Sequence, residues 1–137
     1  MTAEPAPARP EETTILVVDD EDHVRDLCKD ILEAEGYVVI TAADPLVARR
    51  IAASQPVHLL LTDVVMPAMS GLELADHVEA ARKDTKILLM SGYMTAATKA
   101  SGRTLLAKPF TVDALLGAVR ESLTVRRASP FKRREGR

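Results

Sequence analysis

One stretch of the sequence indicates the fold, and it reads Leu59-Leu60-Leu61-Thr62-Asp63-Val64-Val65-Met66-Pro67-Ala68-Met69-Ser70-Gly71. It is an apolar run that contains a single acidic residue, Asp63, and a proline and a glycine then break the chain. Such a run is typical of a strand that is buried on both faces, as in a parallel sheet covered by helices. We therefore expect Asp63 at the carboxyl end of a buried strand, where open α/β sheets place their ligands.

On both sides of this stretch, short aliphatic runs alternate with apolar residues at helical spacing. Further strands are predicted over residues 15–18, 37–41, 86–90 and 105–107. Helices are predicted over residues 24–36, 45–53, 71–82, 95–100 and 111–123. Gly36 is expected to end the first helix, and Asp44 and Thr111 are expected to cap two others. The helical spacing predicts that the core receives Leu27 from the first helix, Leu72, Ala75 and Val78 from the third, and Val112 from the last. Alternation of this kind predicts one doubly wound, five-stranded parallel sheet with helices on both faces.

The composition sets the limits of the domain. A chain of 137 residues corresponds to one domain, which we place at residues 13–125. Residues 1–12 are rich in proline and are expected to be a disordered lead-in, and residues 126–137 are expected to be a disordered basic tail. The single cysteine, Cys28, excludes an internal disulfide and is interpreted as a small core residue.

Charge and hydropathy favour a cytoplasmic protein. No apolar run approaches the roughly 18 residues of a transmembrane segment, and the amino terminus lacks a signal peptide. The net charge is −2, but the basic tail hides an acidic body of about −5. An acidic body argues against direct DNA binding.

Polar residues follow four of the predicted strands. Asp19 and Asp20 follow the first strand, Asp63 the third, Ser91 the fourth and Lys108 the fifth. Because the carboxyl ends of parallel strands meet at one edge, we expect these side chains to lie together. Three clustered carboxylates repel one another by roughly 4 kcal/mol for each pair about 4 Å apart, so the pattern predicts a bound cation.

Oxygen ligands without histidine or cysteine favour Mg²⁺, which suits phosphoryl transfer. Asp63 would be the nucleophile. Asp20, Asp63 and the backbone carbonyl of Val65 would hold the metal, and Asp19 would contribute through water. Lys108 would pair with the carboxylates and then with a phosphoryl oxygen, and Ser91 would hydrogen-bond another oxygen.

These motifs, namely Asp19-Asp20, Asp63 with Met66-Pro67 and Gly71, Ser91-Gly92 and Lys108-Pro109-Phe110, resemble those of the receiver domain of two-component response regulators. The resemblance covers residues 14–123. It implies the flavodoxin-like strand order 2-1-3-4-5, which is one of the common orders of doubly wound sheets. It also implies Mg²⁺-dependent transfer of a phosphoryl group to Asp63 from a sensor histidine kinase or a histidine phosphotransfer protein.

Two features differ from the family pattern. Leu105 stands where the family usually has an aromatic switch residue, and the segment from Ser91 to Lys108 is several residues short, which predicts a stunted fourth helix. Both differences concern the surface that usually carries output. We also hypothesise that Tyr93 and Val65 flank the phosphoryl group and slow its hydrolysis.

Three functions are compared. The first is a single-domain phosphoacceptor that is no enzyme and that signals to an unknown protein target or along a phosphorelay. The second is a receiver-like adaptor that acts without phosphorylation, which Leu105 makes conceivable. The third is a haloacid-dehalogenase-like phosphatase, which is disfavoured because that class places its nucleophile after the first strand within an Asp-x-Asp pattern.

Overall fold

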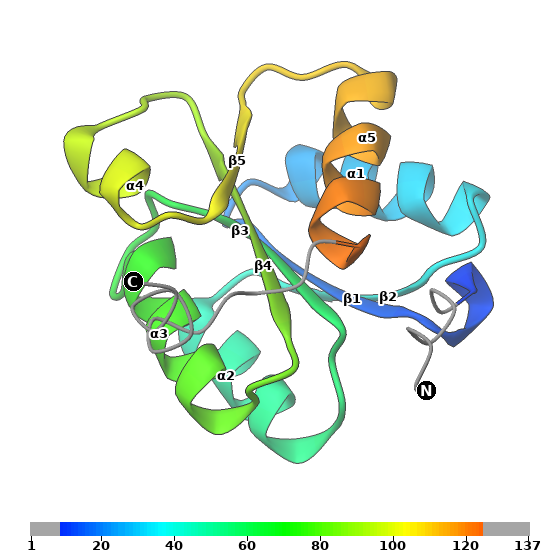
Figure 1. The fold of residues 1–137 in the computed structure, drawn as a ribbon, viewed down its shortest axis with the longest axis horizontal. Helices are drawn as coiled ribbons and strands as arrows, with labels where there is room; N and C mark the ends of the chain where they lie inside the picture. The colour runs from blue at the N-terminus through cyan, green and yellow to red at the C-terminus, as the bar shows by residue number, and fades with distance from the viewer. Residues whose placement is uncertain (1–8, 125–137) are drawn as a thin grey trace, which may run out of the picture.

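The computed structural model describes residues 9–124, and it forms the predicted doubly wound α/β sandwich. Its parallel sheet has the order β2-β1-β3-β4-β5, as the resemblance implied (Figure 1). The strands are β1 (Thr14–Val18), β2 (Val38–Ala42), β3 (Leu59–Asp63), β4 (Lys86–Ser91) and β5 (Thr104–Ala107). The helices are α1 (Asp22–Ala34), α2 (Pro45–Ser54), α3 (Gly71–Ala81), α4 (Ala96–Ala100) and α5 (Val112–Thr124).

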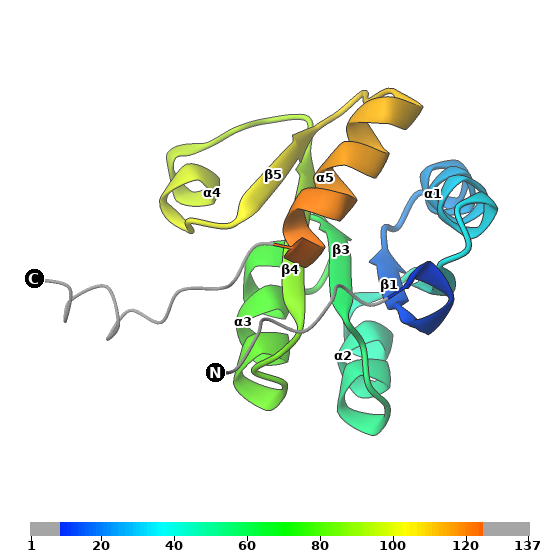
Figure 2. The same ribbon diagram turned by 45° about the vertical axis from the view of Figure 1, so that its right-hand side comes forward.

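The central strands are buried on both faces, as the apolar run at β3 predicted. All five residues of β3 are buried, and β3 pairs with β1 on one side and with β4 on the other. Side chains alternate along each strand, so Leu60 enters the core beneath α2 and α3 while Leu59 and Leu61 enter the core beneath α1 and α5. Figure 2 shows these two helix pairs on opposite faces of the sheet.

Local chemistry fixes the helix ends where the sequence predicted them. The Asp44 carboxylate accepts a hydrogen bond from the Leu46 amide, and the Thr111 hydroxyl accepts one from the Ala114 amide. Gly36 has a φ of +97°, the left-handed conformation that commonly ends a helix and favours glycine.

The structure corrects four details of the predicted elements. Leu27 on α1 and Val112 on α5 were expected to face the core, but their exposed fractions are 49% and 51%. On α3 the residue Leu74, which was not predicted to face inward, is fully buried. Within the expected lead-in, Pro10–Glu12 form a short 3-10 helix, so regular structure begins before Thr13.

Two further expectations concern the ends and the membrane. No helix in the part of the chain from residue 9 to residue 124 is long and apolar enough to cross a membrane. The predicted basic tail lies outside the described residues.

Candidate functional site

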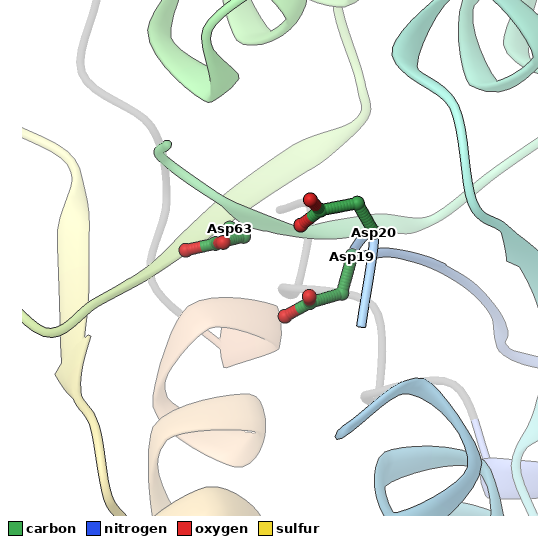
Figure 3. A group of neighbouring side chains, drawn as sticks. All are labelled: Asp19, Asp20 and Asp63. Carbon is green, nitrogen blue, oxygen red and sulfur yellow. The ribbon is translucent and has the colours of Figure 1, made fainter. Parts of the chain in front are cut away.

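Three carboxylates meet at the carboxyl edge of the sheet. Asp19 and Asp20 directly follow β1, and Asp63 is the last residue of the neighbouring strand β3. One oxygen from each of the three lies within 4.8 Å of the others, and Figure 3 shows the side chains projecting to the same side of the strand ends. The predicted acidic cluster is therefore present.

Asp19 is the most deeply buried member of the cluster. Its side chain is inaccessible to solvent, and both oxygens are engaged. Oδ1 accepts a hydrogen bond from the Glu21 amide at 2.9 Å, and Oδ2 accepts one from the Lys108 ammonium at 2.9 Å. This carboxylate thus ties the loop after β1 to the loop after β5.

Lys108 is the cation that faces the cluster. Its Nζ lies 2.9 Å from Asp19 Oδ2 and 3.4 Å from Asp63 Oδ1, with Glu21 at 3.9 Å. Burial alone would lower the pKa of Lys108, but its hydrogen bond and attraction to Asp19, and then to Asp63, outweigh that cost and raise the pKa. Lys108 is therefore a permanent positive charge at the site.

Asp63 is buried, with 7% of its surface exposed. Burial raises the pKa of its carboxyl group above the ordinary value, and repulsion by Asp19 adds to this effect, while Lys108 opposes it. Its carboxylate is consequently destabilised in the isolated protein. A second cation near it would favour the ionised form.

Asp20 and Val65 lie at the mouth of the site. Asp20 is exposed, and no hydrogen bond or ion pair within residues 9–124 engages its carboxylate. Val65, two residues after Asp63, has 66% of its surface exposed. Their accessibility is compatible with the predicted roles, and those roles stay predictions.

Ser91 ends β4 beside Asp63, but its hydroxyl is bonded within its own turn. Ser91 Oγ accepts a hydrogen bond from the Tyr93 amide at 2.9 Å and donates one to the Tyr93 carbonyl. The Tyr93 side chain is 76% exposed. The expected cover of a phosphoryl group by the Tyr93 ring therefore stays a prediction, and the Ser91 hydroxyl must leave its turn to reach such a group.

The short fourth helix is confirmed, because α4 has only five residues. Leu105 on β5 is half-buried and packs against the core cluster that contains Leu89. An aliphatic side chain thus occupies the position of the usual aromatic switch residue, as the sequence indicated.

Two residues shape the site without having been given a role from the sequence: Gly71, which was quoted only as part of a motif, and Arg25, which was not singled out. A Cβ atom added to Gly71 would lie 2.1 Å from the Asp63 carbonyl oxygen, so only glycine allows α3 to begin this close to β3. Arg25 on α1 reaches back to the loop after β1 and donates a hydrogen bond to the Asp19 carbonyl at 2.7 Å. Gly71 belongs to the quoted motif, but nothing in the spacing of Arg25 distinguishes it from an ordinary surface arginine.

The residues at this edge fit a hard divalent cation. The donor set consists of carboxylate oxygens alone, and the cluster combines one buried and one exposed aspartate around Asp63. The nearby thiol of Cys28 offers no ligand, because burial raises its pKa to about 12, with Asp19 contributing in the same direction. The cluster suits Mg²⁺ better than a softer metal.

A doubly wound parallel sheet with three carboxylates and a lysine at the switch point between β1 and β3 belongs to the class of α/β proteins that bind ligands at the carboxyl ends of their strands. Comparison with known proteins narrows this class. The model of the response regulator receiver domain matches residues 15–120, and the chain belongs to this family. It is thus a receiver of two-component phosphorelay signalling.

Relatives of two kinds match the chain. Sporulation initiation phosphotransferase F of Bacillus subtilis is 31% identical over 117 residues, which are 82% of this chain and 94% of that protein. The C4-dicarboxylate transport transcriptional regulatory protein DctD of Pseudomonas aeruginosa is also 31% identical, but the match spans only 26% of its length. Among solved structures, the response regulator TrrA of Thermotoga maritima in complex with Mg²⁺ and BeF is 34% identical with a TM-score of 0.74, over 81% of this chain and 99% of that one.

Proposed function

We propose that Asp63 accepts a phosphoryl group from a phosphohistidine of a sensor histidine kinase or a histidine phosphotransfer protein. The observation that supports this most directly is the position of the Asp63 carboxylate. It ends the central strand, 3.4 Å from the Lys108 ammonium and within 4.8 Å of two further carboxylates. No other group of three potential metal-binding residues occurs in the part of the chain that the structure describes.

The transfer is a displacement at phosphorus. A carboxylate oxygen of Asp63 attacks the phosphorus atom, the P–N bond breaks, and its electron pair returns to the imidazole nitrogen. The product is an acyl phosphate on Asp63 and a neutral histidine on the partner. Lys108 moves from Asp63 toward the new phosphoryl oxygens while it keeps its bond to Asp19, and Ser91 gives up the Tyr93 carbonyl to donate to another oxygen.

Mg²⁺ would be held by Asp20 and Asp63 with the backbone carbonyl of Val65, and Asp19 would act through water. When bound, it neutralises charge that develops on the phosphoryl oxygens. The chain supplies the remaining requirements, because it holds the Asp63 carboxylate beside Lys108 and places the carboxylates on two adjacent strand ends.

We further propose that the protein signals through protein contacts or passes its phosphoryl group along a relay, as a single-domain cytoplasmic regulator and not as an enzyme. The match over 94% of a protein named as a phosphotransferase supports the relay. The relatives of which the chain covers about a quarter include a transcriptional regulatory protein.

Two observations favour a second candidate, an adaptor that acts without phosphorylation. Leu105 replaces the aromatic switch residue, and the Ser91 hydroxyl is bonded away from Asp63. The match to the receiver-domain family argues against the third alternative, a haloacid-dehalogenase-like phosphatase.

Incubation with acetyl phosphate and Mg²⁺, followed by intact-protein mass spectrometry, separates the two candidates. We expect the mass of one phosphoryl group to be added to the wild type and to Asp84→Asn, which changes an exposed aspartate far from the site. Asp63→Asn should gain nothing. If the wild type gains no mass while a known receiver treated in parallel gains one phosphoryl group, the phosphoacceptor proposal fails and the adaptor is favoured.

A further inference from the structure

The Asp20 side chain makes no contact of its own that would fix its position within the described residues. Its carboxylate is exposed and has no partner within residues 9–124, whereas the buried Asp19 has two. It also lies close to Asp19 and Asp63, which repel it. The position of Asp20 is therefore set by the backbone of the turn formed by residues 19–22, which we call the acidic turn.

Helix α1 lacks the side-chain N-cap that would usually fix the turn before it. Helix α1 begins at Asp22 with Glu21 as its N-cap, and the Glu21 side chain makes no capping hydrogen bond. Asp44 and Ser70, in contrast, cap α2 and α3 with their side chains. The Glu21 amide donates a hydrogen bond to Asp19 Oδ1 at 2.9 Å, but the end of the turn at Asp22 must be held by another contact.

Arg25 provides that contact. Its guanidinium donates one hydrogen bond to the Asp19 carbonyl at 2.7 Å and pairs through its other terminal nitrogen with the Asp22 carboxylate. The two acceptors are the first and last residues of the acidic turn, and Asp20 lies between them. The Arg25 side chain is only 15% exposed, so its hydrogen bond to the Asp19 carbonyl is partly shielded from water, whereas the Asp22 carboxylate is 84% exposed.

We propose that Arg25 is a positioning residue for the metal and phosphoryl site, which it does not contact. It spans the acidic turn and holds Asp20 facing Asp63, so that the carboxylates are ordered before a cation arrives. This inference rests on the proposed function, because it assigns Asp20 to the cation. Loss of Arg25 would leave Asp63 and Lys108 in place. The acidic turn would then become ordered only when the cation binds, and this ordering would lower the affinity for the cation.

The test is calorimetric titration with Mg²⁺ in the absence of any phosphoryl donor. We expect Arg25→Ala to bind Mg²⁺ about tenfold more weakly than the wild type, and Arg25→Lys to give an intermediate value because one ammonium does not reproduce the two-nitrogen fork. Arg120→Ala is the matched control, since it removes an exposed arginine that pairs with Glu35 beyond the other end of α1. Its affinity should equal that of the wild type.

Phosphorylation by acetyl phosphate at varied Mg²⁺ separates positioning from general damage. For Arg25→Ala we expect the Mg²⁺ concentration for half-maximal rate to rise about tenfold while the rate at saturating Mg²⁺ stays near that of the wild type. A purely structural role would lower the saturating rate and leave the half-maximal concentration unchanged, and that result would overturn the inference.

Two further outcomes distinguish this inference from the proposed function. If the wild type binds Mg²⁺ and Arg25→Ala and Arg25→Lys bind it equally well, only the role of Arg25 is refuted. If the wild type itself binds no Mg²⁺, both proposals are refuted. If circular dichroism shows that Arg25→Ala is unfolded, Arg25→Lys is used for the test instead. An unchanged Mg²⁺ concentration for half-maximal rate in that variant counts against the inference.

Discussion

Gly71 connects the fold to the site at the scale of a single residue. Its amide donates a hydrogen bond to the Val64 carbonyl at 2.7 Å, and this bond brings the start of α3 against the end of β3. Because an added Cβ would meet the Asp63 carbonyl oxygen at 2.1 Å, a side chain here must displace the backbone that carries the phosphoacceptor.

We expect Gly71→Ala to lower the free energy of unfolding by about 3 kcal/mol, since the clash involves backbone atoms that have no free space. Gly117→Ala is a matched control on α5, where an added Cβ has no neighbour within 4 Å. It should raise stability by about 0.5 to 1 kcal/mol, because alanine is the better helix former. Urea unfolding monitored by circular dichroism measures both, and equal effects of the two substitutions would contradict this account.

The ionised carboxylate of Asp63 lowers the stability of the folded protein, and its proposed role as phosphoacceptor explains why it is nevertheless buried. Burial and then repulsion by Asp19 raise the pKa of its carboxyl group, so the folded protein binds this proton more tightly than the unfolded chain does. The contribution of Asp63 to stability therefore falls as the pH rises through the raised pKa. In metal-free buffer the ionised carboxylate destabilises the fold at neutral pH.

We expect Asp63→Asn to be more stable than the wild type by about 1 kcal/mol at pH 7 in EDTA, because the amide removes the repulsion and costs no desolvated charge. The advantage should shrink as the pH falls through the raised pKa of Asp63 and disappear below the ordinary aspartate range. Asp84→Asn, at an exposed site, should show no such trend. Thermal unfolding at a series of pH values would contradict the prediction if the advantage grew on acidification.

At the scale of elements, the segment between α4 and β5 is held by Arg103. Its guanidinium lies 2.7 Å from both Asp76 and Glu79 on α3, and its side chain is 14% exposed. Burial opposes its charge, but the hydrogen bonds to the two acids raise the pKa of Arg103. With α4 reduced to five residues, this pair of bridges joins the start of β5 to α3.

We expect Arg103→Ala to cost about 2 kcal/mol of stability, because charge-assisted hydrogen bonds in a shielded position are stronger than exposed ion pairs. Arg120→Ala removes a bridge whose arginine is 59% exposed and should cost at most about 0.5 kcal/mol. Denaturant titration of the two variants measures this ratio. A loss in Arg103→Ala no larger than in Arg120→Ala would show that the α4–β5 segment is held by other contacts.

The elements that the sequence predicted are those that local rules determine. β3 follows from its apolar run, the end of α1 follows from Gly36, and the starts of α2 and α5 follow from Asp44 and Thr111. Contacts between elements were not predictable in this way. The exposure of Leu27 depends on which turn of α1 meets the sheet. The bridges of Arg103 join residues 24 and 27 positions apart.

The candidate site was likewise predictable where local rules apply and unpredictable where side-chain contacts between elements decide. The parallel topology brings Asp19, Asp63, Ser91 and Lys108 to one edge, and this could be predicted because each follows a recognisable strand. The bonding of the Ser91 hydroxyl to Tyr93 could not, since the alternatives for a hydroxyl at a strand end differ only in side-chain rotation. The reach of Arg25 to the Asp19 carbonyl is hidden for the same reason.

At the scale of the whole molecule, the acidic edge links stability to ligand binding. Three carboxylates and one lysine leave the edge with excess negative charge, and a divalent cation that binds only the folded state will stabilise it. At ten times its dissociation constant, Mg²⁺ should add about 1.4 kcal/mol to the free energy of unfolding. Thermal unfolding with increasing Mg²⁺ measures this gain, and Asp20→Asn should show a smaller one. An unchanged midpoint for the wild type would contradict a metal site at this edge.

Phosphorylation should be reported through β4, α4 and the start of β5. The Ser91 hydroxyl cannot remain bonded to the Tyr93 carbonyl and also donate to a phosphoryl oxygen, so occupation of the site opens the turn that leads into α4. Arg103 anchors the far end of this segment on α3, and Leu105 packs against the core beneath it. The change should therefore be confined between Ser91 and Leu106.

Amide hydrogen exchange with and without Mg²⁺ and beryllofluoride, a phosphoryl mimic, tests this route. We expect exchange to change in the segment 91–106 of the wild type, and to change further toward β5 in Arg103→Ala because the anchor on α3 is lost. Ser91→Ala should bind the mimic more weakly and leave the segment unaltered, since the alanine cannot exchange one bond for the other. If the wild type binds the mimic and exchange in 91–106 stays the same, the phosphoacceptor must signal through another surface, such as α1 and its acidic turn.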